Sequence, residues 1–307
     1  MVNIVYIHSH DTGRYVQPYG YSIPTPAIQR LAEEGTLFRK AFCANPTCSP
    51  SRASLLTGQW AHSCGMGGLV NRGWSLPHPD RLLPNFLRQH GYATVRAGIQ
   101  HVVTDPEEGG YSRILEGESG DWNTVARAKS FLEEKHDQPF FLDVGFFATH
   151  RLGDGFSNSP KGQEPTNPNY VRPPTTLPDN STTRGDMGTY IDAARTLDDL
   201  VGTVVQSLDE QNLADNTLVI CTTDHGIAFP RMKCNLTDHG MGVMMILRGP
   251  GGFTGGGAID GLVSHIDLFP TVCELTELQF PAWLQGVSLM PLVNGLDRVR
   301  SEIFSEI

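Results

Sequence analysis

Short apolar runs that alternate with helical patterns are the feature that most limits what this chain can fold into. The runs at residues 4–7, 93–97, 140–147, 218–222 and 243–247 consist mainly of apolar residues and are bounded by turn residues. Strands that are apolar on both faces are typical of a parallel sheet covered by helices on both sides. We therefore predict an α/β fold with a mostly parallel central sheet, and one main domain over residues 1–307.

Three segments between these runs carry apolar residues at helical spacing. The first follows Pro24-Thr25-Pro26 and ends near Gly35, where a C-cap glycine is expected. The second follows Asp121, and the third spans residues 186–211. Residues 152–184 are rich in Pro, Asn, Thr and Gly without periodicity, which predicts a long irregular loop of the kind that is functional or disordered.

Charge and hydropathy exclude several classes of partner. The formal net charge is -10, and no block of basic residues occurs, so we expect neither nucleic acid nor an anionic membrane as a partner. No apolar run approaches the ~20 residues of a membrane helix. The N-terminus lacks the basic and hydrophobic regions of a signal peptide. We expect a soluble, cytoplasmic protein.

The cysteines are scattered and form no C-x-x-C pair, which argues against a zinc ribbon or a disulfide framework and favours a reducing compartment. Their positions are Cys43, Cys48, Cys64, Cys221, Cys234 and Cys273. Any special chemistry must therefore belong to a single cysteine.

Groups able to bind a metal follow two of the predicted strands. His10 and Asp11 come shortly after the run at residues 4–7, and Asp224 and His225 follow the run at 218–222. In open parallel sheets the ligand crevice lies outside the carboxyl ends of the strands. We therefore expect these four side chains to form a mixed oxygen and nitrogen site for a divalent metal.

Two further histidines stand at equivalent positions. His101 follows the run at residues 93–97, and His150 follows the run at 140–147. A single histidine at a strand end is more often a cap or a solvated loop residue. The convergence of several such residues on one sheet edge is what favours a site.

The segment from Cys48 to Gly58 is the most informative stretch of the chain. Pro50 suits the first turn of a helix, so Cys48 is expected at a helix N-terminus. Backbone N–H groups there favour an anion or an ionised nucleophile. The residues alone leave two interpretations open: a buried cysteine before an ordinary helix, and the thiolate of a hydrolase.

The run Cys48-x-Pro50-x-Arg52, continued by Leu55-Leu56-Thr57-Gly58, resembles the signature of type I sulfatases, which belong to the alkaline phosphatase superfamily. Other matching segments are Asn3-Ile4-Val5, His10-Asp11, Phe38-Arg39-Lys40-Ala41-Phe42, Asp224-His225-Gly226, Arg248-Gly249-Pro250-Gly251 and His265-Ile266-Asp267-Leu268-Phe269-Pro270-Thr271. The segments from Cys48 to Gly67 and from Asp224 to Pro230 look most like the heparan N-sulfatase branch and its bacterial relatives.

This resemblance implies an alkaline-phosphatase-like sandwich and a hydrolase of sulfate esters or sulfamates. It implies that a formylglycine-generating maturation enzyme oxidises Cys48 to formylglycine. The hydrated aldehyde then attacks sulfur and releases the alcohol or amine, and the remaining sulfate ester collapses by elimination. The expected substrate is a sulfated small molecule or saccharide.

The resemblance also implies roles for individual residues. Arg52 supports the formylglycine, and Lys233 grips the sulfate. His101 and His150 lie near the sulfate, where one of them donates a proton to the leaving group. The ligands of the divalent metal are His10, Asp11, Cys48, Asp224 and His225.

The chain departs from the family pattern at its metal ligands. His10-Asp11 replaces the usual acidic pair, and Asp224-His225 replaces the usual Asp-Asn pair. The family implies Ca²⁺, while the additional nitrogen ligands open Mn²⁺ as the alternative. The Asp-His pair also resembles the phosphonate monoester hydrolase branch, so a phosphonate or phosphodiester hydrolase is a second hypothesis. Ile99 stands where many sulfatases carry a lysine.

Family members normally continue into a small C-terminal subdomain with an antiparallel sheet. This chain ends at Ile307, where the next strand would begin. We therefore expect that subdomain to be missing. A third hypothesis follows, in which the chain is a catalytically silent binding module that retains the core fold.

Overall fold

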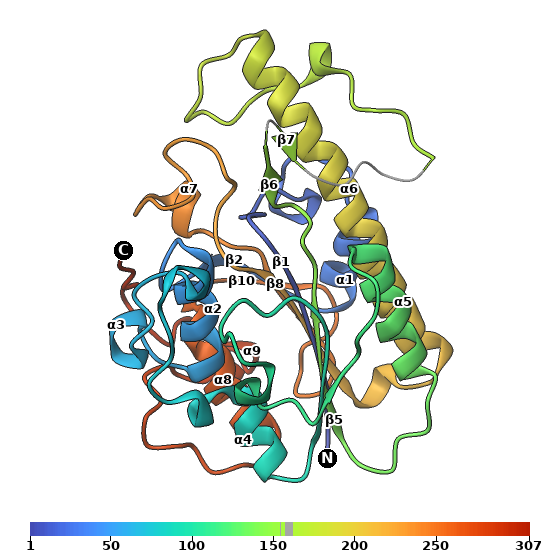
Figure 1. The fold of residues 1–307 in the computed structure, drawn as a ribbon, viewed down its shortest axis with the longest axis vertical. Helices are drawn as coiled ribbons and strands as arrows, with labels where there is room; N and C mark the ends of the chain where they lie inside the picture. Colours follow the sequence, from blue (N-terminus) through green and yellow to red (C-terminus); the bar gives the residue numbers. More distant parts are fainter. Residues whose placement is uncertain (154, 157–161) are drawn as a thin grey trace.

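The computed structural model describes residues 1–153, 155–156 and 162–307. A β-sheet runs through its centre (Figure 1). This sheet has eight strands in the order β10-β2-β9-β8-β1-β5-β3-β4. The strands are β1 (Asn3–Ser9), β2 (Thr36–Phe42), β3 (Ala93–Gly98), β4 (Arg113–Ile114), β5 (Phe140–Gly145), β8 (Thr217–Thr223), β9 (Met245–Arg248) and β10 (Gly257–Ser264). Among them β9 alone runs antiparallel to its neighbours. The predicted α/β fold with a mostly parallel sheet is confirmed.

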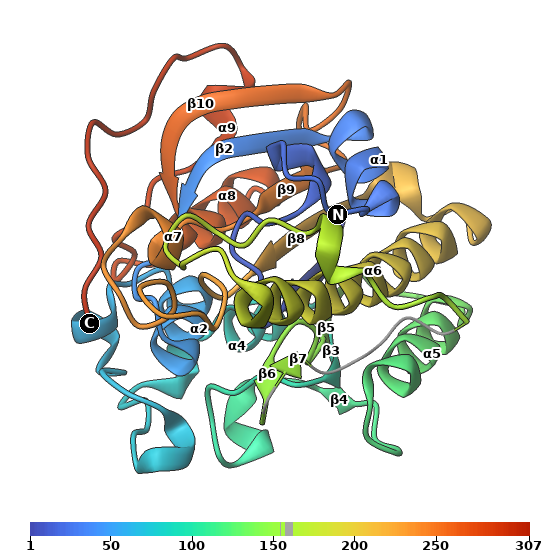
Figure 2. The same ribbon diagram turned by 90° about the horizontal axis from the view of Figure 1, so that it is seen from above.

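Helices cover both faces of the sheet (Figure 2). One face carries α1 (Pro26–Glu34), α5 (Asp121–Leu132) and α6 (Ser181–Glu210), and the other carries α2 (Cys48–Thr57), α4 (Leu83–Gln89) and α8 (Leu268–Leu275). Shorter helices are α3 (Ala61–Cys64), α7 (Asp238–Met241) and α9 (Met290–Val293). The 3-10 segments are η1 (Gln17–Tyr19), η2 (Val70–Arg72), η3 (Pro79–Arg81), η4 (Pro106–Gly109), η5 (Pro168–Tyr170), η6 (Ala214–Asn216) and η7 (His265–Asp267).

The central strands are continuous in apolar residues because both of their faces are buried. Along β1, Ile4 packs with the α2 side of the core, whereas Val5 and Ile7 pack with the α6 side, as the two-residue period of a strand requires. β1 pairs in parallel register with β5 and β8, with Ser9 opposite Thr223. This register brings the residues that follow β1 and β8 to the same edge of the sheet.

Each run predicted as a strand overlaps one in the structure, but β2, β4 and β10 of the central sheet were missed. The predicted irregular loop at residues 152–184 is partly wrong. α6 begins at Ser181, five residues before the predicted start at 186, because Asn180 forms a capping box with Thr183. The loop also contains η5, and a hairpin of β6 (Arg151–Leu152) and β7 (Gly155–Phe156) adjoins it. Residues 154 and 157–161 of the predicted loop lie outside the described residues.

Gly35 ends α1 as predicted, but the reason for a glycine is different. Its φ is -112°, so it does not adopt the left-handed conformation of a typical C-cap glycine. An added Cβ would overlap the carbonyl oxygen of Leu247 in β9 and lie 2.9 Å from that of Leu31. The glycine therefore allows close approach of the helix end to the sheet.

Within the described residues, no helix combines the length and the apolar character that crossing a membrane requires. All six cysteines are free thiols, and all except Cys234 are buried.

Candidate active site

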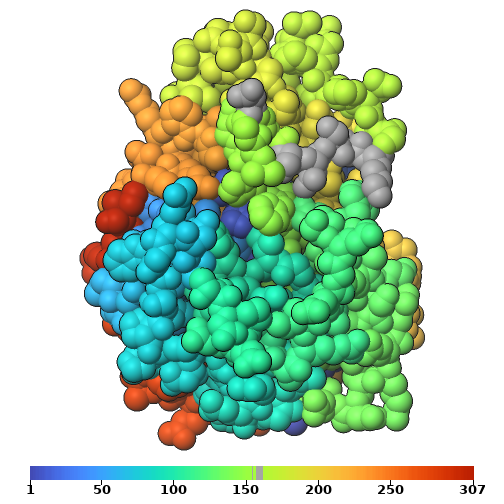
Figure 3. Space-filling view, in the orientation of Figure 1, coloured from blue at the N-terminus to red at the C-terminus, as the bar shows by residue number. Residues whose placement is uncertain are grey.

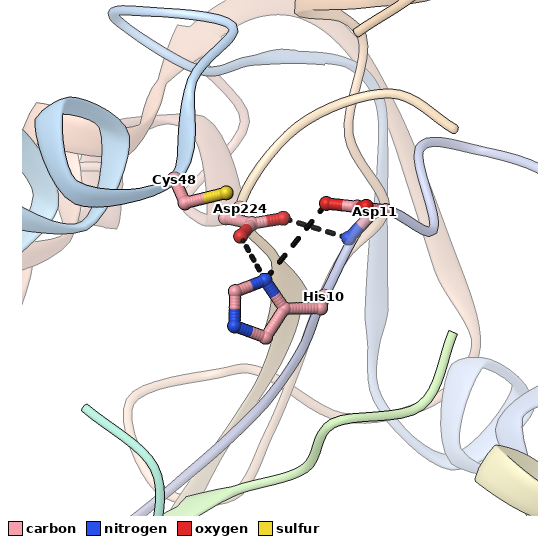
Figure 4. Close-up of side chains that lie close together, drawn as sticks. All are labelled: His10, Asp11, Cys48 and Asp224. Carbon is pink, nitrogen blue, oxygen red and sulfur yellow. Dashed lines mark hydrogen bonds and ion pairs between the residues drawn. The ribbon is translucent and has the colours of Figure 1, made fainter. Parts of the chain in front are cut away.

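The carboxyl ends of β1 and β8 meet the N-terminus of α2 at the floor of a hollow in the surface. Figure 3 shows blue atoms of the N-terminal segment at the bottom of this hollow, between orange and cyan segments. One ligand atom from each of His10, Asp11, Cys48 and Asp224 lies within 4.8 Å of the others (Figure 4). All four residues are buried. The structure thus brings together residues that sequence reasoning took from three separate segments.

The four side chains form a donor set that suits a divalent cation. His10 Nδ1 lies 2.9 Å from Asp224 Oδ2 and 3.8 Å from Asp11 Oδ1, and the backbone N–H of Asp11 donates to Asp224 Oδ1 at 2.8 Å. Two buried carboxylates this close together call for positive charge between them. The imidazole and sulfur donors suit a transition ion better than Ca²⁺. The carboxylate oxygens suit either kind of ion.

Burial would by itself raise the pKa of both carboxyl groups, but positive neighbours reverse this. The neighbouring His10 imidazole and the charges of His225 and Lys233 lower the pKa of Asp11 to about 2. The charges of His225, Arg52 and His10 hold the pKa of Asp224 well below its ordinary value. Both groups are therefore carboxylates at neutral pH, as metal ligands must be.

His225 lies beside this set. Its Nδ1 donates to the carbonyl oxygen of Gly226 at 3.0 Å, so Nε2 is the nitrogen directed into the site. That Nε2 lies 3.3 Å from Cys48 Sγ and 3.4 Å from Asp11 Oδ1. The position suits either a fifth metal ligand or a proton carrier for the nucleophile.

Cys48 is the first residue of α2, as predicted. Burial alone raises the pKa of its thiol, but the charge of His225 and the neighbouring His10 and His101 side chains hold that pKa well below its usual value. The helix N-terminus acts in the same direction. The site therefore stabilises negative charge at the position of Cys48 Sγ.

Arg52 lies one helical turn beyond Cys48 and is buried. Its Nη2 donates to Asp224 Oδ2 at 3.0 Å and to the carbonyl oxygen of Ser9 at 2.8 Å, and its Nη1 donates to His8 Nδ1. The guanidinium therefore ties α2 to the ends of both β1 and β8.

A buried polar chain behind Arg52 was not predicted from the sequence. His8 Nε2 lies 2.8 Å from Asp143 Oδ1, and the Tyr111 hydroxyl donates to Asp143 Oδ2. Because Arg52 can only donate, His8 Nδ1 accepts and Nε2 carries the proton. His8 is buried, and both of its ring nitrogens form hydrogen bonds. The sequence did hold a signal for this chain of groups: Asp143 lies within the apolar run at residues 140–147, and a buried acid is rarely unpaired.

The predicted substrate-contacting residues surround the same site. The ring centroids of His101 and His150 lie 5.9 and 5.0 Å from that of His10, and the three histidines line a pocket of about 550 Å³. Lys233 Nζ lies 2.9 Å from both carboxylate oxygens of Asp11. The structure brings these residues together, while their catalytic roles stay predictions.

Comparison with known proteins now identifies the class. The sulfatase family model matches residues 2–278, so the chain belongs to the sulfatase family, hydrolases of the alkaline phosphatase superfamily. It is 30% identical to N-sulphoglucosamine sulphohydrolase of Homo sapiens over 95% of this chain and 66% of that protein. It is 25% identical to an ulvan-active sulfatase of Formosa agariphila over 96% of this chain and 55% of that protein. The chain thus spans less than two thirds of the length of both relatives.

Solved structures support the fold. A protein in complex with its substrate D-glucosamine-2-N,6-O-disulfate matches with a TM-score of 0.74 at 19% identity, over 98% of this chain and 82% of that chain. A protein in complex with a neocarrahexaose matches with a TM-score of 0.75 at 22% identity, over 94% of this chain and 75% of that chain. The phosphonate monoester hydrolase of Agrobacterium radiobacter matches with a TM-score of 0.75 at 18% identity, over 96% of this chain and 77% of that chain. The predicted alkaline-phosphatase-like fold is confirmed.

Proposed function

We propose that this chain hydrolyses a sulfate ester or sulfamate with a formylglycine made from Cys48 as its nucleophile. The observation that carries the proposal is the position of Cys48: it begins α2, and its Sγ lies within 4.8 Å of ligand atoms of His10, Asp11 and Asp224. A nucleophile at a helix N-terminus, beside a set of metal ligands, is the arrangement that attack on an anionic ester needs.

A divalent ion held by His10, Asp11, Asp224 and His225, beside the side chain of residue 48, would supply positive charge that stabilises the anionic nucleophile and the sulfate oxygens. Arg52 holds Asp224 in place by a charge-assisted hydrogen bond of 3.0 Å. Ca²⁺ and Mn²⁺ are the two candidates.

The reaction requires two steps. A hydroxyl of the hydrated aldehyde at residue 48 loses its proton and attacks sulfur, the bond from sulfur to the leaving oxygen or nitrogen breaks, and His101 or His150 protonates the leaving group. The second hydroxyl then loses its proton, the C=O bond forms again, and the bond from the former aldehyde carbon to the sulfate oxygen breaks. Sulfate leaves, and the aldehyde is restored.

The proposed substrate is a sulfated saccharide. The human relative is an N-sulphoglucosamine sulphohydrolase, another relative is active on ulvan, and one structural neighbour was solved with a disulfated glucosamine. N-sulfoglucosamine is therefore the first compound to test, followed by O-sulfated sugars.

The test is sulfate release by protein co-expressed with a formylglycine-generating enzyme. We expect release from N-sulfoglucosamine or from 4-nitrophenyl sulfate, and complete loss in Cys48→Ala. Cys273→Ala removes another buried thiol, in α8, and should retain the activity. A rate in Cys48→Ala equal to that of the unsubstituted protein would contradict the proposal.

Hydrolysis of phosphonate monoesters is a second candidate. It is favoured by His225, whose Nε2 lies 3.3 Å from Cys48 Sγ, at the position where the usual sulfatase pattern has an asparagine. Rates on 4-nitrophenyl sulfate and on a 4-nitrophenyl phosphonate monoester separate the two candidates. A much larger kcat/KM for the phosphonate would replace the first proposal with the second.

A further inference from the structure

Two adjoining hollows extend from the three histidines along the sheet edge. The pocket of about 550 Å³ begins at His10, and a second of about 480 Å³ continues toward the start of α5. Both are lined by Arg96, Gly98, Ile99 and Phe147. These shared residues mark the junction of one groove that leads away from the proposed metal site, longer than a single sulfate group needs.

Arg96 supplies a positive charge at this junction. Among the described residues no carboxylate forms an ion pair with it, and its Nε is buried without a hydrogen-bond partner. Asp143 stands beside it in the sheet, but both oxygens of that carboxylate are bound, by His8 and Tyr111. The guanidinium lies over the Tyr111 ring, with Cζ 5.6 Å from the centroid.

The first pocket suits an anion better than the second. Its described lining contains no carboxylate, and Arg96 is the one guanidinium among those residues, whereas Glu116 and Asp121 line the second pocket. A guanidinium can bind carboxylate or sulfate through two parallel N–H donors, which makes it a selective contact for an oxyanion.

Phe147 provides an apolar surface at the same junction. Its side chain is 43% exposed, although its ring lies 5.6 Å from that of His10 and 5.9 Å from that of His150. The carboxylate of Asp121 accepts the backbone N–H groups of Phe147 and Ala148 at 2.8 and 2.9 Å. An exposed aromatic face held this firmly suits the apolar face of a sugar ring.

We propose that Arg96 binds a second anionic group of the substrate, a carboxylate or another sulfate, while Phe147 packs against the sugar ring that carries the scissile sulfate. Arg96 is then a specificity-determining residue that selects polyanionic saccharides over singly charged ones. The choice of a sulfated saccharide as ligand rests on the proposed function. The binding measurement does not, because it requires no turnover.

Calorimetric titration of the Cys48→Ala protein tests the inference without turnover. The ligands are N-sulfoglucosamine, its 6-O-sulfated form, and the disaccharide of N-sulfoglucosamine with a uronic acid. The last two distinguish sulfate from carboxylate as the second group. We expect at least one of them to bind about tenfold more tightly than N-sulfoglucosamine, since charged hydrogen bonds are strong.

Arg96→Gln should abolish that preference, and Arg96→Lys should retain part of it. Arg72→Gln, which removes an exposed positive charge in η2 outside the groove, should leave it intact. Phe147→Ala should weaken all three sugars without changing their order. If the Cys48→Ala protein with Arg96 intact binds all three ligands with equal affinity, the inference is overturned. This outcome can be seen without any Arg96 variant. An equal effect of Arg96→Gln on all three also overturns it.

Hydrolysis of 4-nitrophenyl sulfate separates this inference from the proposed function. That ester carries no second anion, so Arg96→Gln should leave its rate within about twofold. If the converted protein cleaves no sulfate ester while the preference for dianions still depends on Arg96, the proposed function fails and the binding inference stands.

Discussion

At the scale of residues, the site depends on a line of buried polar groups that runs from Tyr111 through Asp143, His8 and Arg52 to Asp224. Every proton in this line is fixed by the chemistry of its donors and acceptors. Since breaking a buried network leaves unpaired groups behind, the line holds the Arg52 guanidinium in one orientation.

His8→Leu should lower the free energy of unfolding by about 1–3 kcal/mol, because Arg52 and Asp143 each lose a partner. Urea denaturation measures this. Asp143→Asn and the double variant complete a cycle in which we expect non-additivity above about 0.5 kcal/mol. Strictly additive effects would show that the two groups are not coupled.

His265 in η7 gives the fold an acid sensitivity. Burial lowers its pKa from 6.5 to about 3, against the opposing charge of Asp224. The fold holds it neutral, whereas the unfolded chain binds a proton below pH 6.5. Its contribution to stability is therefore complete above pH 6.5 and falls toward pH 3, by up to about 1.4 kcal/mol per pH unit.

His265→Gln should flatten this part of the stability profile measured by denaturation at several pH values. The matched change His78→Gln, at a side chain that is 58% exposed, should leave the profile unchanged. Identical profiles for His265→Gln and the unsubstituted protein would contradict the argument.

Sequence reasoning found the residues at strand ends but not the groups that support them. His10, Asp11 and Asp224 could be predicted because parallel strands place their carboxyl ends at one edge. His8 and Asp143 are 135 positions apart and become partners only through the register of β1 and β5. Arg96 could not be recognised for a similar reason, since its lack of a carboxylate partner is a property of the fold.

At the scale of elements, burial decided which strands could be predicted. β1 and β8 are buried at every position, so their sequences are continuous apolar runs. β10 is an edge strand of the sheet and β2 is its neighbour. Arg39 in β2 pairs with Asp260 in β10 at 2.9 Å. Such strands carry charged side chains and show no apolar run, so sequence periodicity missed both.

Gly35→Ala should destabilise the protein by about 1–3 kcal/mol, because the new methyl group overlaps the carbonyl of Leu247 and forces α1 away from β9. Gly185→Ala is the matched control: nothing lies within 4 Å of its added Cβ, and it sits within α6. That change should stabilise the protein by about 0.5–1 kcal/mol. Thermal denaturation of both variants checks the opposite signs.

At the scale of the whole molecule, the proposed metal site joins elements from distant parts of the chain. Its ligands follow β1, begin α2 and follow β8, so it links the start of the chain to its last third. A metal that binds there and not to the unfolded chain must stabilise the entire fold.

Addition of Ca²⁺ or Mn²⁺ to chelator-treated protein should therefore raise the melting temperature, by the equivalent of about 2.7 kcal/mol at a hundredfold excess over Kd. Asp224→Asn should remove the effect, whereas Asp238→Asn, at an exposed carboxylate that pairs with Arg14, should retain it. The ion that gives the larger shift identifies the preferred metal. Equal shifts in both variants would place the ion elsewhere.

The central claim is that Cys48 becomes the nucleophile, and peptide mass spectrometry tests it most directly. Protein co-expressed with a formylglycine-generating enzyme is digested, and the mass of the peptide that contains Cys48 is measured. We predict the mass of the aldehyde or its hydrate at position 48, with Cys43 unmodified as the internal reference. An unmodified thiol at Cys48 under conditions that convert a control sulfatase would contradict the account.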